Sequence, residues 1–345
     1  MTTPAWLLYP ALALLAAGLG FSAHRAGLCT VRAVTEIATT RRAHMLASFF
    51  KSAGWVLVIA TPMVWLAPAV EPLPIVWPTL GTLLGGVLFG AGAAVNNGCA
   101  VSTLTRLGSG DAGYGLTLVG LGLGAALAAL PPSSPEPPIG ASPLAAPATW
   151  TVALWAAAAA WAAWEARSLI RTRRRGLTTR EHLLSDRMRL SVAALLIGAA
   201  NALLCAAVGA WAYTGLVVDA ADWLTGAAAT HPPDAVRAGL LVALLAGVTV
   251  SAVARGTFRW RARPRAAWLR HLAGGTLMGV GIAMVPGGND AILMHALPAL
   301  SPHAVPAYGA MLAGVAAGIA VMGRLLGAGE GVRCGGDVCD RVIER

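Results

Sequence analysis

The stretch that decides the fold is GAGAAVNNGCAVSTLTRLGSG, residues 90–110. Its first part is apolar and spaced by glycine, it stops at Asn97-Gly98, and Cys99 then opens an apolar and hydroxylic segment. This second segment has roughly ten residues, whereas a helix that spans a bilayer needs about 20. The pattern predicts a membrane helix that breaks at Gly98, followed by a half-helix. Broken helices at membrane depth occur where they line a cavity, and their N-termini direct a positive dipole end toward it.

The composition is that of a polytopic membrane protein. Of the 345 residues 57% are hydrophobic and 12% are charged, against about 25% charged residues in a soluble domain. The 41 glycines allow close contact between helices in lipid. The net charge of +10 comes from basic residues between apolar spans, which favours the positive-inside rule over nucleic-acid binding. The first 20 residues contain no Lys or Arg, so they are interpreted as a membrane helix rather than a signal peptide.

The apolar stretches predict an all-α polytopic membrane protein with about nine transmembrane helices. The predicted spans are 4–20, 44–66, 78–96, 113–130, 149–169, 190–210, 235–254, 271–286 and 304–323. Shorter apolar segments between the spans are interpreted as four re-entrant half-helices, at about 28–39, 98–107, 211–226 and 290–298.

The basic residues orient the predicted spans. With the N-terminus outside, each of the 25 Lys and Arg residues except Arg237 lies on the inner side. The opposite orientation would place the same residues outside, which contradicts the positive-inside rule. This rule is informative here because the loops are short. We therefore expect the C-terminus on the inner side of the membrane.

Spans and half-helices follow each other in the same order in two halves of the chain, residues 1–130 and 190–326. Residues 131–189 contain a proline-rich outer linker, a connecting helix and an arginine-rich inner loop, which gives the halves opposite orientations. Residues 327–345 are expected to form a cytoplasmic tail. Two inverted repeats with interrupted helices at matching positions are typical of transporters with a site between the repeats.

Two cysteines occupy equivalent positions in the first half, Cys29 at the start of one half-helix and Cys99 at the start of the other. A lone buried cysteine is usually a packing residue, but two at matching positions suggest thiols that face each other. The N-termini of broken helices direct a positive dipole end toward whatever lies there. Cys29, Cys99, Asn97 and Gly98 are therefore candidate substrate-binding residues.

The second half carries Pro286-Gly287-Gly288-Asn289-Asp290 at the matching position. Proline and glycine end the preceding span, and Asn289 or Asp290 caps the next half-helix. An ionisable residue at membrane depth is a functional candidate by default. Gly288, Asn289 and Asp290 therefore join the candidate substrate-binding residues.

The remaining cysteines receive structural interpretations. Cys205 lies within a span and is interpreted as a core residue. Cys334 and Cys339 in the tail do not have the spacing of a usual zinc pair, and we expect them to stay reduced, with a redox or persulfide-accepting role as the alternative. Glu36 is interpreted as a solvated residue at a mouth, with proton coupling as the alternative.

Several function classes lack their motifs in this sequence. It contains no phosphate-binding loop, which argues against ATP-driven transport by this chain, and no Ser-His-Asp or HExxH set. The histidines are scattered. We expect a protein that is not an enzyme and that needs no cofactor and no metal.

Residues 20–29, 92–108 and 271–308 together resemble the YeeE/YedE family, bacterial inner-membrane proteins of the sulfur-transport type. The last of these stretches is the most distinctive, with GGTLMGVG at 274–281, PGGND at 286–290 and LPALSPHA at 297–304. The resemblance covers nearly the whole chain apart from the linker and the tail.

The resemblance implies an hourglass of inverted repeats that takes up thiosulfate across the bacterial inner membrane. In that membrane, the orientation predicted from the basic residues gives a periplasmic N-terminus and a cytoplasmic C-terminus. The family passes the ion between cysteine thiols along a narrow central path, and Cys29 and Cys99 match two such cysteines. Where thiosulfate-type members can carry a cysteine in the second half, this sequence has Gly288-Asn289-Asp290. The expected substrate is thiosulfate or a related sulfur or selenium species, and a cytoplasmic sulfur-carrier protein is a candidate partner.

Two other functions fit the same residues. An intramembrane thiol oxidoreductase or sulfurtransferase would use Cys29 and Cys99 within bonding range, about 4.4–6.8 Å between Cα atoms. A structural membrane component would use the half-helices only to hold partners, and its centre would be dry and without polar groups.

Overall fold

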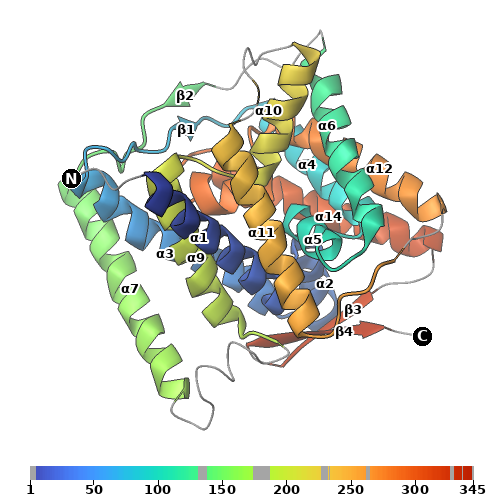
Figure 1. Cartoon of the computed structure of the whole chain (residues 1–345), viewed down its shortest axis with the longest axis horizontal. Coiled ribbons are helices and arrows are strands. Elements are labelled where there is room, and N and C mark those ends of the chain that lie inside the picture. Colours follow the sequence, from blue (N-terminus) through green and yellow to red (C-terminus); the bar gives the residue numbers. More distant parts are fainter. Residues whose placement is uncertain are drawn as a thin grey trace.

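The computed structural model describes residues 5–130, 138–173, 187–226, 232, 234–261, 265–326, 330–335 and 337–343. These residues are mainly helical (Figure 1). Parts of two predicted connections, the proline-rich 131–137 and the arginine-rich 174–186, lie outside the described residues.

Long helices occupy each of the predicted span positions. They are α1 (Ala5–Ala26), α3 (His44–Leu66), α4 (Leu80–Asn96), α6 (Gly115–Ala129), α7 (Thr149–Arg173), α9 (Leu190–Val208), α11 (Ala235–Ala254), α12 (Arg265–Met284) and α14 (Ala304–Leu326). Within the described residues, seven helical segments are long and apolar enough to cross a membrane, or eight if the bent pair of α12 and the segment after it is one span. The alanine-rich α7, which carries Glu165 and Arg167, is not among them. Nine crossings therefore remain a prediction.

Short helices stand where half-helices are predicted. They are α2 (Thr30–Thr40), α5 (Ala100–Leu107), α10 (Tyr213–Thr225) and α13 (Asn289–Ala291), which continues into the π-helix η2 (Ile292–Ala296). Each follows a long helix after a short break, and the break before α13 bends the chain by 48°. Asn97 (φ 56°) and Gly287 (φ 137°) make two of these breaks, because a left-handed backbone cannot continue a helix. Whether these helices are re-entrant in a membrane stays a prediction.

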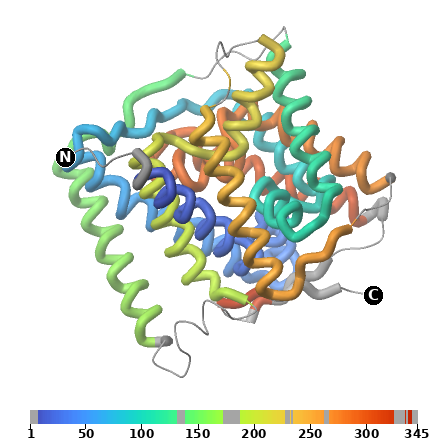
Figure 2. Tube along the Cα trace, viewed as in Figure 1, coloured from blue at the N-terminus to red at the C-terminus, as the bar shows by residue number. Residues whose placement is uncertain are grey.

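The long helices pack in matching pairs (Figures 1 and 2). In one group α1 packs against α11 and α3 packs against α9, and in the other α6 packs against α12 and α4 packs against α14. Contacts of α1 with α9 and of α4 with α12 complete the groups. The set of pairs is unchanged when α1–α6 are exchanged with α9–α14. The helices thus pair as two related halves would, while the repeat boundaries and the opposite orientations remain predictions.

Glycine allows these helices to touch backbone to backbone. A Cβ added at Gly247 of α11 would lie 1.9 Å from the carbonyl oxygen of Ala17 in α1. In the other group, a Cβ at Gly90 of α4 would lie 2.1 Å from the carbonyl oxygen of Met311 in α14. No side chain fits at such separations, which explains why small residues occupy the contacts.

The helix α7 packs on α3 at the edge of the molecule (Figure 1). Lys51 Nζ of α3 donates to Glu165 Oε1 of α7 at 2.5 Å, so the negative charge of Glu165 in this helix is paired. Trp155 Nε1 donates to the carbonyl oxygen of Val58 at 3.0 Å. These contacts fix the connecting helix to the first half.

The described strands form two small antiparallel pairs. One joins β1 (Ile75–Val76) to β2 (Ile139–Gly140), and the other is a hairpin of β3 (Glu330–Gly335) and β4 (Val338–Ile343) that packs against α2. Cys334 and Cys339 lie opposite each other in this hairpin and form a disulfide. The expectation that they stay reduced is wrong for this structure, because the hairpin brings the two residues into cross-strand register.

Two carboxylates attach the tail and α2 to the bundle. Asp337 of the hairpin accepts from the backbone N–H of Ser191 and from Arg189 Nε, both at 3.0 Å. Glu36 of α2 is fully buried and accepts from the backbone N–H groups of His44 and Met45, at 3.1 and 2.9 Å. The interpretation of Glu36 as a solvated residue is therefore wrong, since its carboxylate binds the unpaired N–H groups at the start of α3.

Candidate functional site

Cys29 and Cys99 are the N-cap residues of α2 and α5. Each has an extended backbone, and neither side chain caps its own helix. A cysteine is a poor cap compared with Ser, Thr, Asp or Asn, so its thiol stays available for other contacts. Both residues are buried, with 1% and 0% of their surfaces exposed, and both thiols are free.

Each sulfur contacts the half-helix that the other cysteine begins. The Cys29 thiol donates to Ser102 Oγ in the first turn of α5, with a sulfur–oxygen distance of 3.3 Å. The backbone N–H of Thr30, the first residue of α2, donates to Cys99 Sγ at 3.3 Å. The two half-helices therefore meet at their N-termini, with the two thiols between them.

Asn289 brings the second half of the chain to the same point. It is fully buried at the start of α13, and its Nδ2 donates to Thr30 Oγ1 at 3.1 Å. Among the described residues its Oδ1 has no hydrogen-bond partner. A buried amide oxygen without a partner is costly, so this oxygen is free to accept a hydrogen bond from a further donor.

Asp290 joins the starts of α13 and α10. Its Oδ1 accepts from the Thr214 hydroxyl at 2.6 Å, and its Oδ2 accepts from the Thr214 backbone N–H at 3.4 Å. Thr214 lies in the first turn of α10. The carboxylate thus lies where two helix N-termini offer N–H groups to a negative charge. Together these contacts bring the N-termini of α2, α5, α10 and α13 into one cluster.

Gly98, Gly288 and Asn97 shape the breaks that place these side chains. A Cβ at Gly98 would lie 2.6 Å from Ser102 Oγ, and one at Gly288 would lie 2.7 Å from Asp290 Oδ1. Asn97 ends α4 in a left-handed conformation and turns the chain into α5. The described contacts thus unite Cys29, Cys99, Asn289 and Asp290, whereas Gly98, Gly288 and Asn97 shape the backbone around them.

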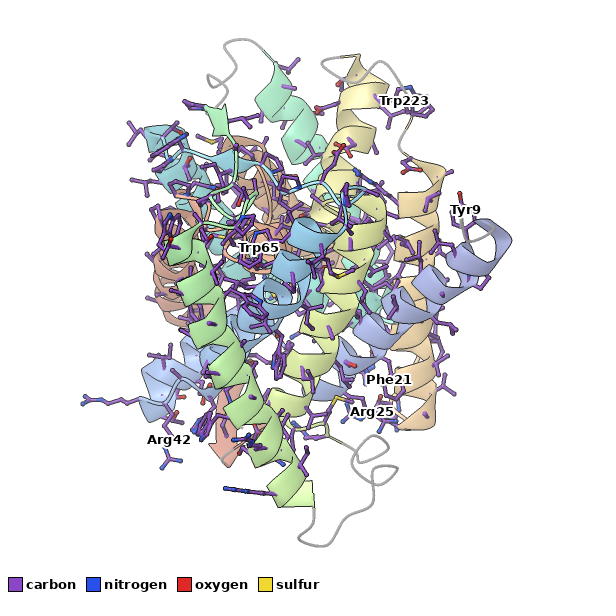
Figure 3. All side chains as sticks on the ribbon, turned by 90° about the vertical axis from the view of Figure 1, so that its left-hand side faces the viewer. Tyr9, Phe21, Arg25, Arg42, Trp65 and Trp223 are labelled. Atoms are coloured by element: carbon purple, nitrogen blue, oxygen red, sulfur yellow. A yellow bond between two sulfur atoms is a disulfide. The ribbon has the colours of Figure 1, made fainter. Side chains whose placement is uncertain are left out.

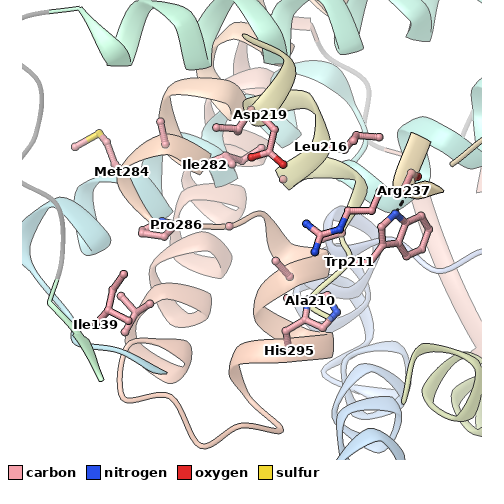
Figure 4. A pocket seen from close by; sticks show the side chains of 17 residues that line it. Ile139, Ala210, Trp211, Leu216, Asp219, Arg237, Ile282, Met284, Pro286 and His295 are labelled. Carbon is pink, nitrogen blue, oxygen red and sulfur yellow. Dashed lines mark hydrogen bonds between the residues drawn. The ribbon is translucent and has the colours of Figure 1, made fainter. Parts of the chain in front are cut away.

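A cavity with a volume of about 540 Å³ lies beside α10 (Figure 4). We call it the α10 cavity. Figure 4 shows Arg237 and Asp219 extending toward its centre, with Trp211 beside Arg237. Gly287, in the break before α13, also lines it. This cavity therefore opens onto the half-helix starts of the second half.

A second cavity, of about 290 Å³, lies beside the half-helix starts of the first half. We call it the arginine cavity, because it is lined by Arg25, Arg32, Arg106, Arg187, Arg255 and Arg261. A narrow space of about 80 Å³, the linking cavity, shares Trp211 and His295 with the α10 cavity and Leu28 and Thr105 with the arginine cavity. The cysteines do not line these three cavities, although their neighbours Leu28 and Ser102 do.

A protein-family model described as Sulphur transport matches residues 25–317. The chain belongs to this family. No curated protein matches it. The match runs across the half-helix starts from Cys29 to Asp290 and confirms the resemblance to the YeeE/YedE family. Membership of a transport family is consistent with the prediction that the chain is not an enzyme.

In this sulphur-transport protein a buried polar network supports the thiols, and the sequence interpretation missed it. Asn96 Oδ1 accepts from Thr117 Oγ1 and contacts His271 Nδ1, each at 2.8 Å. Asn96 Nδ2 donates to the carbonyl oxygen of Gly98 at 2.8 Å and to Thr103 Oγ1 at 3.0 Å. The network holds the turn before Cys99. In the sequence, the available signal was an amide residue, Asn96, within an apolar run. Its partners Thr103, Thr117 and His271 lie in three other helices, so the network could not be identified from the sequence.

Proposed function

We propose that this sulphur-transport protein takes up thiosulfate, or a related inorganic sulfur or selenium anion, through a central path at the Cys29 and Cys99 thiols. One observation carries the proposal: two free, buried thiols at the starts of α2 and α5 each contact the half-helix that the other cysteine begins. The anion would move from the α10 cavity through the half-helix starts into the arginine cavity.

The groups at the half-helix starts suit an anion with a soft terminal sulfur. Backbone N–H groups at helix N-termini attract the negative charge and hydrogen-bond to oxygen. The S–H group of Cys29, which donates to Ser102 in the structure, can instead donate weakly to the terminal sulfur of thiosulfate. A thiolate would repel the ion, so both thiols act in their protonated form.

Asn289 would stand in for the second-half cysteine that thiosulfate-type relatives can carry. Its amide is neutral, and its Nδ2 donates to the Thr30 hydroxyl beside Cys29. An amide donor in place of a thiol favours oxygen over sulfur as the contacting atom. This difference keeps sulfite and other oxyanions among the candidate substrates.

We propose that the arginine cavity faces the cytoplasm and the α10 cavity faces the periplasm of the bacterial inner membrane. Arginines gather at the inner ends of membrane helices. Figure 3 shows Arg25 and Arg42 near one end of the molecule, and Tyr9 and Trp223 near the other. The C-terminal hairpin would then be cytoplasmic, where a sulfur-carrier protein could receive the transported sulfur.

The scaffold hypothesis fits these contacts less well than transport does. A scaffold without transport would have an apolar centre, whereas Asn289, Thr30 and Ser102 are buried at this one. A permease uses these polar groups together with the free thiols. An oxidoreductase that cycles a bond between Cys29 and Cys99 is the alternative function for the same two thiols.

Uptake of labelled thiosulfate into proteoliposomes tests the proposal. We expect uptake to saturate with thiosulfate concentration and to be inhibited less by sulfate than by unlabelled thiosulfate, because sulfate lacks a terminal sulfur. Empty liposomes give the background rate. Uptake at the background rate by correctly folded protein would refute thiosulfate transport.

A further inference from the structure

Six arginines from five different segments converge on the arginine cavity. Arg25 lies in the last turn of α1, Arg32 lies in α2, Arg106 lies in α5, Arg187 precedes α9, and Arg255 and Arg261 follow α11. In the sequence these residues are spread over more than 200 positions and belong to separate helices and loops. Their convergence on one hollow is a property of the fold, and no half-helix motif requires it.

The protein holds several of these side chains in place. Arg25 is 2% exposed, and its Nε donates to Ser251 Oγ at 3.2 Å. Arg32 donates from a terminal nitrogen to the carbonyl oxygen of Gly27 at 3.3 Å, and its buried Nε has no hydrogen-bond partner among the described residues. Arg106 hydrogen-bonds to the Tyr114 hydroxyl and lies over its ring. The guanidinium groups are thus positioned by neighbours and not only by solvent.

The charge around the cavity is strongly unbalanced. Among the described residues that line it, the six guanidinium groups face a single carboxylate, that of Asp111. Part of the positive charge is complemented by the C-terminal ends of α1 and α11, which attract cations. The positive-inside rule also places arginines in these loops, but it does not require them to surround one hollow. Like charges held this close repel each other, and a bound anion would relieve the repulsion.

We propose that the arginine cavity is a binding site for a divalent tetrahedral oxyanion, of the class of thiosulfate, sulfate and phosphate. Guanidinium groups bind such anions through paired, charge-assisted hydrogen bonds. The volume of about 290 Å³ holds one such anion with several waters, since a water occupies about 30 Å³. Ser102 lines the cavity and also accepts the hydrogen bond of the Cys29 thiol, so the site adjoins the thiols directly.

In transport, this site receives the oxyanion that has passed the thiols. That role rests on the proposed function, whereas anion binding in the cavity does not. Sulfate or phosphate that enters the arginine cavity from the cytoplasm would compete with the transported ion for this site. The cavity therefore adds a second anion site, distinct from the contacts made by Cys29 and Cys99.

Calorimetric titration of the full-length protein in detergent tests the site. Sodium thiosulfate, sulfate and phosphate are the probes, at a constant ionic strength of about 0.15 M, where surface charges are screened beyond about 8 Å. The single variants are Arg255→Gln and Arg261→Gln, combined in a double variant. The control is Arg259→Gln, which removes the same charge from an exposed position that does not line the cavity.

We expect divalent anions to bind more tightly than chloride, and the double variant to raise the Kd for sulfate at least about tenfold. Arg259→Gln should change it less than about twofold, and Cys99→Ala should leave sulfate binding intact. The proposed site is overturned if the wild-type protein does not bind sulfate. It is also overturned if the double variant and the control lose equal sulfate affinity, or if Cys99→Ala loses sulfate binding. Intact sulfate binding without thiosulfate uptake would refute the proposed function and leave this site standing.

Discussion

The backbone N–H of Thr30 donates a hydrogen bond to the sulfur of Cys99, with a nitrogen–sulfur distance of 3.3 Å. Thr30 begins α2 and Cys99 caps α5, so the thiol of one half-helix occupies the free N–H of the other. Under the proposed function, an arriving anion would take over this N–H as its own donor. Substrate would then replace a hydrogen bond within the protein at this contact.

Removal of the Cys99 thiol is the first prediction. Cys99→Ala takes away both the S–H donor and the sulfur acceptor at this contact, and we expect thiosulfate uptake to fall about 10- to 100-fold, the loss typical of one hydrogen bond to a charged group. The rate of uptake into proteoliposomes measures this. Cys205→Ala is the matched control, because Cys205 is also a buried free thiol but lies in α9. Equal uptake by the two variants would contradict the assignment of Cys99.

A negative charge at Asn289 is the second prediction. Asn289→Asp keeps the shape of the side chain, but it removes the N–H donor to Thr30 and adds a carboxylate that repels an anion. We expect the uptake of thiosulfate at neutral pH to fall at least about tenfold, since a like charge in a buried site costs several kcal/mol. Uptake assays of Asn289→Asp and Asn289→Ser separate the effect of charge from that of the lost amide. The idea fails if the two variants transport equally well.

The positions of the half-helices could be predicted from the sequence because helix breaks depend on neighbouring residues. Asn97-Gly98 and Pro286-Gly287 stop a helix wherever they occur in an apolar run. Cys29 and Cys99 could be selected for the same reason, since each stands directly before a half-helix. The long helices followed from length and hydropathy alone.

Contacts between distant segments could not be predicted in this way. Ser102 meets the Cys29 thiol across 73 residues, and the arginine cavity brings together arginines from five segments. The sequence predictions for Glu36 and for the Cys334–Cys339 pair were wrong because their contacts do not depend on hydropathy. Glu36 accepts from N–H groups at the start of α3, and the two cysteines meet through the pairing of β3 with β4.

The network around Asn96 gives the third prediction. Thr117→Val removes the hydroxyl that donates to Asn96 Oδ1 and keeps the side-chain shape, so we expect a loss of about 1 kcal/mol of stability. Asn96→Ala leaves several buried groups without partners, each at a cost of about 1–3 kcal/mol, and should also lower uptake by loosening the turn before Cys99. Thermal unfolding in detergent measures both changes.

Thr276→Val is the control for this network. Its hydroxyl donates to the carbonyl oxygen of Leu272 in its own helix at 3.0 Å, so its loss leaves the network intact. We expect its unfolding temperature to stay near that of the wild type. If Thr276→Val lowers the unfolding temperature as much as Asn96→Ala, the network does not have the role assigned to it.

The contact between α1 and α11 gives the last prediction, which tests helix packing without touching the site. Gly247→Ala places a Cβ 1.9 Å from the carbonyl oxygen of Ala17, and a backbone atom cannot rotate away, so the helices must separate. We expect a loss of about 1–3 kcal/mol or more, the usual cost of overpacking. Gly239→Ala on the same helix meets nothing within 4 Å and should be neutral or gain about 0.5–1 kcal/mol from helix propensity. Unfolding temperatures that move in the same direction for both variants would show that α1 and α11 do not pack as closely as the structure has them.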